Sequence, residues 1–267
     1  MPLFSKSCIS YSASNRFFVL CGIQSTRIWM VVSIMINSGE IHAWTALLSE
    51  EVDKLQAYWS FLSDAERARA NKFMHQKNRD GFVIARGILR SLLAKYLNCA
   101  PQDLNFLSGE HGKLYLENSS LEFNISHSRD AVLYAFSLNN PVGIDVEFIR
   151  KDFAYADIAK RFFSSTEVAG LVSLPKNLQC LGFFYTWARK EAFIKAIGKG
   201  VFYDLNKFSV DVNPHSCGKL KLKIDDAKYA AQPWSLCSLV SPDKYAAALV
   251  VGGNDIKIEQ FLYHIDF

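Results

Sequence analysis

The most restrictive feature of the sequence is a set of three closely spaced strand patterns between residues 121 and 148. These patterns span 121–125, 131–138 and 142–148, and an Asn-Asn-Pro turn separates the last two. Because the middle segment is almost wholly apolar, it is expected at the centre of a sheet. A fold organised around β-sheet is therefore predicted.

Groups of strand and helix patterns occur twice, on either side of Pro141. Helices are predicted over 64–73, 78–97, 154–163, 165–174 and 178–197. Further strands are predicted over 40–46, 219–224 and 245–251. A Ser63–Glu66 capping box marks the start of the first helix, and Gly198 marks the end of the last. The order predicts an α+β fold and is compatible with two similar α/β lobes, although no sequence repeat proves them. We place the N-terminal lobe over 40–140 and the C-terminal lobe over 141–267.

Composition and charge narrow the class of protein. With 267 residues, 50% of them hydrophobic and 21% charged, the chain can bury one large core or two packed lobes. A net charge of +4 is too small to indicate a protein that wraps nucleic acid by neutralising phosphates. The six cysteines and six histidines show neither Cys-x-x-Cys nor His-x-x-x-His spacing, so no zinc site or disulfide framework is predicted. We expect a cytoplasmic protein with reduced thiols.

The first 39 residues are treated separately from the folded domain. Their apolar runs, 17–23 and 28–36, are shorter than the roughly 20 residues that span a bilayer. They resemble a secretory signal only loosely. We expect a poorly ordered extension over 1–39, and Met30 and Met35 are alternative translation starts.

One strand pattern carries two carboxylates on the same face. In the Gly-Ile-Asp-Val-Glu sequence from Gly143, a period of two sends Ile144 and Val146 to one side and Asp145 and Glu147 to the other. Neighbouring carboxylates repel one another, and a hard cation with oxygen ligands compensates them. A strand edge in water also tolerates such a pair, so both interpretations stay open.

A helical motif supplies a third carboxylate. Trp187, Glu191 and Lys195 recur at intervals of four residues and therefore share one face of the predicted helix. A carboxylate and an ammonium beside an aromatic ring indicate a partly buried polar site. The alternative is an ordinary Glu–Lys surface pair, worth about 0.2–0.5 kcal/mol. Trp187 favours the polar site.

Other segments offer groups that bind anions. Ser126, His127 and Ser128 end a strand, where their side chains can donate to phosphate oxygens, although a lone histidine is more often structural. Gly112 and Lys113 form a turn. One flank of the 78–97 helix carries Arg79, Arg86 and Arg90. Such a row either lines an anionic groove or forms a solvated flank.

Together these motifs resemble the Sfp-type 4'-phosphopantetheinyl transferases. The family signatures are Gly-Ile-Asp-apolar-Glu and, some forty residues later, Trp-x-x-Lys-Glu-Ala-x-x-Lys, and both are complete here, over 143–147 and 187–195. The segments 124–128 and 86–90 also match, so the resemblance covers roughly residues 40–251. The family's Gly-Lys-Pro turn is altered, because Leu114 follows Lys113.

The resemblance implies the 4'-phosphopantetheinyl transferase fold, a pseudo-twofold monomer of two similar lobes with coenzyme A in the cleft between them. It implies that Asp145, Glu147 and Glu191 bind Mg²⁺, with a metal-bound water as the alternative to Glu147. For coenzyme A it implies Lys190 and Lys195 at the diphosphate, and Arg86, Lys113, Ser126 and His127 at the adenosine end. Arg69, Lys72 and Arg79 are alternatives at the 3'-phosphate.

The implied reaction is attack by a serine of an acyl or peptidyl carrier protein on the β-phosphate of coenzyme A, which releases adenosine 3',5'-bisphosphate. Glu191 would be the general base and Lys195 would stabilise the leaving phosphate. Carriers of fatty acid, polyketide and nonribosomal peptide biosynthesis all stay open. A catalytically silent relative that binds coenzyme A or a nucleotide is one alternative, and a nucleic-acid-binding protein is another. The complete motifs favour the transferase, with neither nucleic acid nor membrane as a partner.

Overall fold

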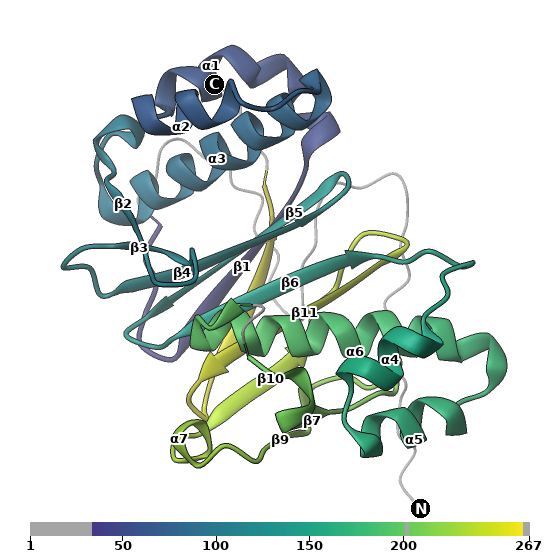
Figure 1. Cartoon of the computed structure of the whole chain (residues 1–267). Helices are drawn as coiled ribbons and strands as arrows, with labels where there is room; N and C mark the ends of the chain where they lie inside the picture. The colour runs from purple at the N-terminus through teal and green to yellow at the C-terminus, as the bar shows by residue number, and fades with distance from the viewer. Residues whose placement is uncertain (1–33, 201–202, 264–267) are drawn as a thin grey trace, which may run out of the picture. The chain divides into compact units, whose positions relative to one another are not determined.

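Two four-stranded sheets organise the chain in the computed structural model, which describes residues 34–200 and 203–263 (Figure 1). The first sheet contains, in spatial order, β12 (Lys257–Leu262), β1 (Glu40–Leu47), β5 (Ala131–Leu138) and β4 (Leu121–Ser128). The second contains β6 (Val142–Phe148), β11 (Tyr245–Gly252), β10 (Trp234–Ser238) and β8 (Lys219–Leu220). Two short ribbons pair β2 (Phe106–Ser108) with β3 (Leu114–Leu116) and β7 (Phe208–Val210) with β9 (Leu222–Ile224). Apart from residues 34–39, the predicted N-terminal extension lies outside the described residues.

Helices follow the first strand of each sheet. The α-helices are α1 (Leu55–Phe61), α2 (Asp64–Ala70), α3 (Gln76–Leu97), α4 (Ala156–Phe162), α5 (Ser165–Ser173), α6 (Lys176–Ile197) and α7 (Ala227–Ala230). Short 3-10 turns are η1 (Leu48–Glu50), η2 (Val52–Lys54), η3 (Pro101–Asp103) and η5 (Leu205–Lys207). The predicted capping box at the start of α2 is confirmed. Within the described part of the chain, no helix combines the length and apolar character that crossing a bilayer requires.

The two sheets repeat one arrangement of elements. β1 is followed by α1–α3 and then by β4 and β5, and β6 is followed by α4–α6 and then by β10 and β11. In each repeat the last strand pairs antiparallel with the other two, so β5 lies between β1 and β4, and β11 lies between β6 and β10. The predicted α+β fold with two similar lobes is therefore confirmed, and the apolar strand β5 is interior as expected.

The C-terminal strand is an exception to the predicted lobe boundary. The boundary after residue 140 falls between β5 and β6, which belong to different sheets. β12, however, pairs in parallel with β1, so it completes the first sheet. The prediction that residues 141–267 form one lobe is wrong for this strand. Local sequence patterns could not reveal the pairing, because the partners Glu40 and Lys257 are 217 residues apart.

Alternate residues of β5 belong to different apolar clusters. On β5, Tyr134 and Phe136 pack with the helices of the first repeat, whereas Leu133 and Ala135 face the second sheet. Ile144 and Val146 of β6 belong to the same inter-sheet cluster. The period of two therefore places the odd-numbered residues of β6 on the opposite face, where α6 packs.

Helix α6 lies directly on β6 because Gly143 has no side chain. A Cβ atom at Gly143 would lie 2.1 Å from the carbonyl oxygen of Ala192 and 2.3 Å from the amide nitrogen of Ala196. The helix ends before Gly198, whose φ of +67° gives the predicted left-handed cap. This close contact brings the last turns of α6 beside the carboxylates of β6.

Candidate active site

Asp145 is the centre of a buried polar cluster between the two repeats. The residue is 4% exposed, and its Oδ1 accepts hydrogen bonds from Lys195 Nζ at 2.6 Å and from Ser126 Oγ at 2.8 Å. Lys195 Nζ also donates to Ser126 Oγ at 2.7 Å. Strands β4 and β6 and helix α6 each supply one of these residues. The structure thus brings together three residues that belong to three separate sequence motifs.

The second carboxylate oxygen of Asp145 has no such partner. Asp145 Oδ2 is buried, and no hydrogen-bond donor among the described residues reaches it. Buried polar atoms are nearly always paired, and an unpaired one costs about 1–3 kcal/mol. A carboxylate oxygen in this state is a candidate ligand for a cation, which satisfies it without a donor hydrogen.

Two further carboxylates interact with Asp145. Burial, followed by the negative charge of Asp145, raises the pKa of Glu147 to about 7, although Lys195 opposes the shift. The same two causes raise the pKa of Glu191. Glu147 also accepts a long hydrogen bond from Ser128 Oγ at 3.5 Å. The pattern indicates an excess of negative charge that a divalent cation would offset.

The three carboxylates are close enough to perturb one another, but they do not enclose a preformed metal site. In residues 34–200 and 203–263, no three His, Cys, Asp or Glu side chains are grouped as a metal ion would require. Repulsion between their negative charges opposes a closer grouping of the carboxylates, and Lys195 Nζ already donates to Asp145 Oδ1. The donor chemistry and the unpaired Asp145 Oδ2 fit a hard cation. The assignment of Mg²⁺ ligands therefore stays a prediction.

Lys190 has a different role from the predicted one. It is 0% exposed, and its Nζ donates to both carboxylate oxygens of Glu167 and to the carbonyl oxygen of Phe208, each at 2.7 Å. Burial lowers its pKa to about 8, although Glu167 opposes the shift. The structure contradicts the prediction that Lys190 contacts the diphosphate, because the ammonium is saturated inside the C-terminal repeat. Glu167 was not predicted, although the capping box that it forms with Ser164 marks its position in the sequence.

His127 and Lys113 are two of the residues predicted for the adenosine end. His127 is exposed beside Ser126, and desolvation together with the positive charge of Lys195 lowers its pKa. Lys113 Nζ reaches the second repeat, where it donates to the carbonyl oxygens of Val142 at 2.9 Å and Ala196 at 3.1 Å. The structure thus brings His127 and Lys113 to the junction of the repeats.

The arginine row on α3 does not form a continuous basic surface. Arg90 is 1% exposed, and it donates to Glu66 Oε2 at 2.7 Å and to backbone carbonyl oxygens. Arg86 Nε lies 3.4 Å from Glu66 Oε1. Arg79 packs over the ring of Trp59 at 5.0 Å. For Arg90, both predicted alternatives are wrong, since it neither lines a groove nor lies in solvent. Binding of nucleic acid through this row loses its support.

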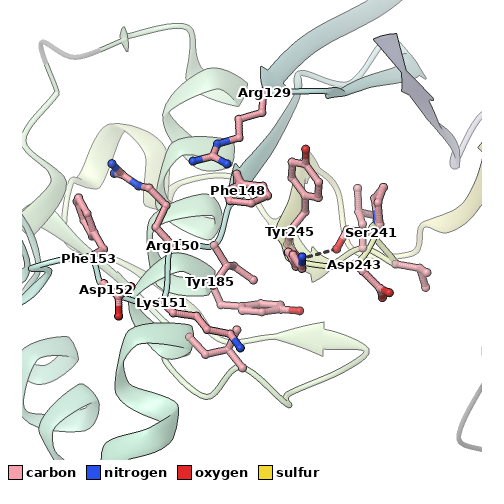
Figure 2. A pocket seen from close by; sticks show the side chains of 16 residues that line it. Arg129, Phe148, Arg150, Lys151, Asp152, Phe153, Tyr185, Ser241, Asp243 and Tyr245 are labelled. Carbon is pink, nitrogen blue, oxygen red and sulfur yellow. Dashed lines mark hydrogen bonds between the residues drawn. The ribbon is translucent and has the colours of Figure 1, made fainter. Parts of the chain in front are cut away.

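A separate cavity of about 980 Å³ lies beyond the end of β6. Basic and aromatic side chains are prominent in its lining, among them Arg129, Phe148, Arg150 and Tyr185 (Figure 2). The guanidinium of Arg129 lies 3.7 Å from the ring centre of Phe148. None of the described lining residues is Asp145, Glu191 or Lys195, so this cavity is distinct from the carboxylate cluster.

The two repeats and the cluster between them define an α+β protein with a buried carboxylate–lysine site at the junction of its repeats. Comparison with known proteins identifies the family. Residues 141–250 match the model of the 4'-phosphopantetheinyl transferase superfamily, and residues 43–139 match that of the N-terminal part of 4'-phosphopantetheinyl transferases.

Curated relatives agree with the two family models. The chain is 35% identical over 235 residues to the 4'-phosphopantetheinyl transferase HetI of Nostoc sp., a match that covers 86% of this chain and 95% of HetI. It is 33% identical over 181 residues to the 4'-phosphopantetheinyl transferase Sfp of Bacillus subtilis, covering 67% of this chain and 78% of Sfp. The chain therefore belongs to the 4'-phosphopantetheinyl transferase superfamily. Enzymes of this family transfer phosphopantetheine from coenzyme A to a carrier-protein serine, so the predicted family and class of enzyme are confirmed.

Proposed function

We propose that Asp145, Glu147 and Glu191 hold Mg²⁺ while this protein transfers the 4'-phosphopantetheine group of coenzyme A to an acyl or peptidyl carrier protein. The main support is Asp145 Oδ2, which is buried and lacks a hydrogen-bond partner among the described residues. The raised pKa values of Glu147 and Glu191 support the same assignment. Burial and then the negative charge of Asp145 raise them, and a cation would offset both causes. When bound, Mg²⁺ would offset negative charge on the phosphates of the substrate.

Glu191 would act on the attacking serine, and Lys195 would act on the departing phosphate. Glu191 would accept the proton of the carrier serine, since a carboxylate with a raised pKa is a better base than an ordinary one. The serine oxygen forms a bond to the β-phosphorus as the bond to the departing phosphate breaks, which releases adenosine 3',5'-bisphosphate. Lys195 would stabilise the charge on that departing oxygen. Ser126 holds the Lys195 ammonium in place at 2.7 Å.

The adenosine end of coenzyme A would lie at the junction of the repeats, against His127 and Ser126. Lys113 uses two of its N–H groups on the Val142 and Ala196 carbonyls, which leaves the third for a phosphate. Arg86, paired with Glu66, together with one of Arg69, Lys72 and Arg79, would complete the site. We further propose that the protein works as a cytoplasmic monomer.

A mass assay tests the proposed function. The protein is incubated with coenzyme A, Mg²⁺ and a panel of purified apo carrier proteins, and each carrier is then weighed intact by mass spectrometry. A carrier should gain one phosphopantetheine group, and the gain should disappear when Mg²⁺ is chelated. No gain with any carrier, despite measurable binding of coenzyme A, would favour a catalytically silent relative.

A further inference from the structure

Three polar side chains on β4 accept hydrogen bonds from alternate backbone amides of β6. Asn124 Oδ1 accepts from the amide of Ile144 at 2.9 Å, and Ser128 Oγ accepts from that of Phe148 at 3.0 Å. Between them, Ser126 Oγ accepts from the amide of Val146 at 3.4 Å. The spacing of two residues on both strands makes this a regular ladder of side chain to backbone.

This ladder lies where two sheet edges meet. β4 ends the first sheet and β6 ends the second, and the two strands are not paired through their backbones. An edge strand has amides that need partners. In the first repeat, the corresponding edge of β1 pairs with the backbone of β12. In the second repeat, side chains of β4 accept the hydrogen bonds of the β6 edge in place of a backbone strand. The backbones of β4 and β6 are therefore separated by the length of a side chain.

The ladder is connected to the carboxylate cluster. Ser126 Oγ donates to Asp145 Oδ1 at 2.8 Å, and Ser128 Oγ donates to Glu147 Oε2 at 3.5 Å. Each serine therefore holds one β6 amide and also the carboxylate of the residue before that amide. Asn124 is buried at 8% exposure, and its side-chain oxygen accepts from the Ile144 amide, which is a backbone group.

We propose that Asn124, Ser126 and Ser128 form a ladder that fixes β6 against β4 and thereby positions Asp145 and Glu147 for the cation. Asn124 is a positioning residue, because it acts on Asp145 only through the backbone of β6. The inference rests on the proposed function, since it concerns the same carboxylates. Partners in the shell outside metal ligands typically change metal affinity or activity by about 10- to 100-fold when removed.

Hydrogen exchange of the β6 amides tests the ladder itself. Asn124→Leu keeps the size of the side chain and removes its acceptor. We expect the amides of residues 144, 146 and 148 all to exchange faster than in the wild type. Ser137→Ala is the matched control, because it removes a buried hydroxyl from the neighbouring strand β5, where Ser137 bonds to Asn140. Faster exchange at residue 144 alone, or at none of the three, would overturn the ladder.

Binding of Mn²⁺, followed by the electron paramagnetic resonance signal of the free ion, tests the positioning. Asn124→Leu and Ser128→Ala should each weaken Mn²⁺ binding by about 10-fold. Ser128→Thr, which keeps the hydroxyl, should restore it, and Ser137→Ala should leave it unchanged. Equal affinity in the wild type, Asn124→Leu and Ser128→Ala would overturn the inference. A wild type that fails the carrier assay but shows these exchange and Mn²⁺ changes would instead refute the proposed function and leave the ladder standing.

Discussion

Helix α6 supplies the lysine of two lysine–carboxylate pairs, which differ in how many of their polar atoms have hydrogen-bond partners. In the closed pair, Glu167 accepts from Lys190 and also from the backbone amides of Val210 and Ser164, both at 2.8 Å. In the open pair, Lys195 and Asp145 leave one buried oxygen of Asp145 without a hydrogen-bond partner in the described part of the chain. The two lysines are only five residues apart in sequence.

The difference separates a structural contact from a binding site. The closed pair ties α6 to α5 and β7, and it has no donor or acceptor to spare for a ligand. The open pair reaches solvent, since the side chain of Lys195 is 27% exposed, and its carboxylate can still take a ligand. Sites that bind or react commonly keep such unfavourable arrangements at the expense of stability. The closed pair should therefore govern folding and the open pair activity.

Lys190→Met should have the largest effect, and the effect should be on stability. It leaves Glu167 as an uncompensated buried charge, so the free energy of unfolding should fall by about 3–5 kcal/mol. Denaturant titration followed by circular dichroism measures this change. Lys176→Met, at an exposed position of the same helix, is the control and should change little. If Lys190→Met has normal stability but has lost affinity for coenzyme A, Lys190 binds the phosphates and the prediction is wrong.

Asp145→Ala should have the opposite profile. Phosphopantetheine transfer should fall by more than about a hundredfold, because even outer-shell partners of metal ligands cost up to that factor. The free energy of unfolding should change far less than in Lys190→Met. Although burial is the main cause of the raised pKa of Glu147 and Glu191, the substitution removes the second cause, the negative charge of Asp145. The carrier mass assay and denaturant titration give the two values. Asp157→Ala, at an exposed position on α4, should change neither. Near-normal turnover by Asp145→Ala would exclude Asp145 as a metal ligand.

A third lysine sharpens the comparison. Lys113 precedes β3, and its ammonium contacts the backbone carbonyls of Val142 on β6 and Ala196 on α6 and not a carboxylate. Burial lowers its pKa from 10.5 to about 8. Above pH 8 the unfolded chain therefore binds more protons at Lys113 than the folded protein, so this lysine makes stability rise with pH until about 10.5. Between pH 8 and 9.5 its contribution should be roughly 1.5 kcal/mol, at 1.36 kcal/mol per pH unit. The neutral amine keeps two N–H donors for the Val142 and Ala196 carbonyls.

Denaturant titrations at several pH values, on the wild type and on Lys113→Met, measure this contribution. The stability difference between the two proteins should grow in favour of the wild type as pH rises from 8 to 9.5. A difference that is constant over this range would show that the Lys113 ammonium is not desolvated in the folded protein.

Features that depend on neighbouring residues could be predicted from the sequence. The Ser63 capping box, the Gly198 helix end and the interior position of β5 each follow from residues within one element. Pairing between β1 and β12 could not be predicted, because neither strand contains a signal for its partner. The family resemblance supplied the two-lobe architecture, which the repeated order of elements supports.

Some residues of the candidate site were predicted correctly and others were not. The motifs led to Asp145 and Lys195, and strand periodicity placed Asp145 on the correct face. Trp187 does not support the polar site as predicted. Its ring packs among apolar rings, with its centre 5.9 Å from that of Phe162 and 5.8 Å from that of Phe183. The resemblance misassigned Lys190, because a sequence motif cannot show that a carboxylate of another helix, here Glu167, already binds the ammonium.

His127→Ala should have the smallest effect, and it tests how far the open site extends. The lowered pKa of His127 means that its ring is mostly neutral near pH 7 in the free protein, so binding a phosphate there requires uptake of a proton. Affinity for coenzyme A, measured by calorimetry, should fall several-fold in the variant, by about 1 kcal/mol. The wild-type affinity should decline from pH 6 to pH 8, and this decline should be weaker in His127→Ala. His75→Ala, at the exposed start of α3, is the control. If affinity and its pH dependence are both unchanged in His127→Ala, the open site stops at Ser126 and the phosphate contacts must come from elsewhere.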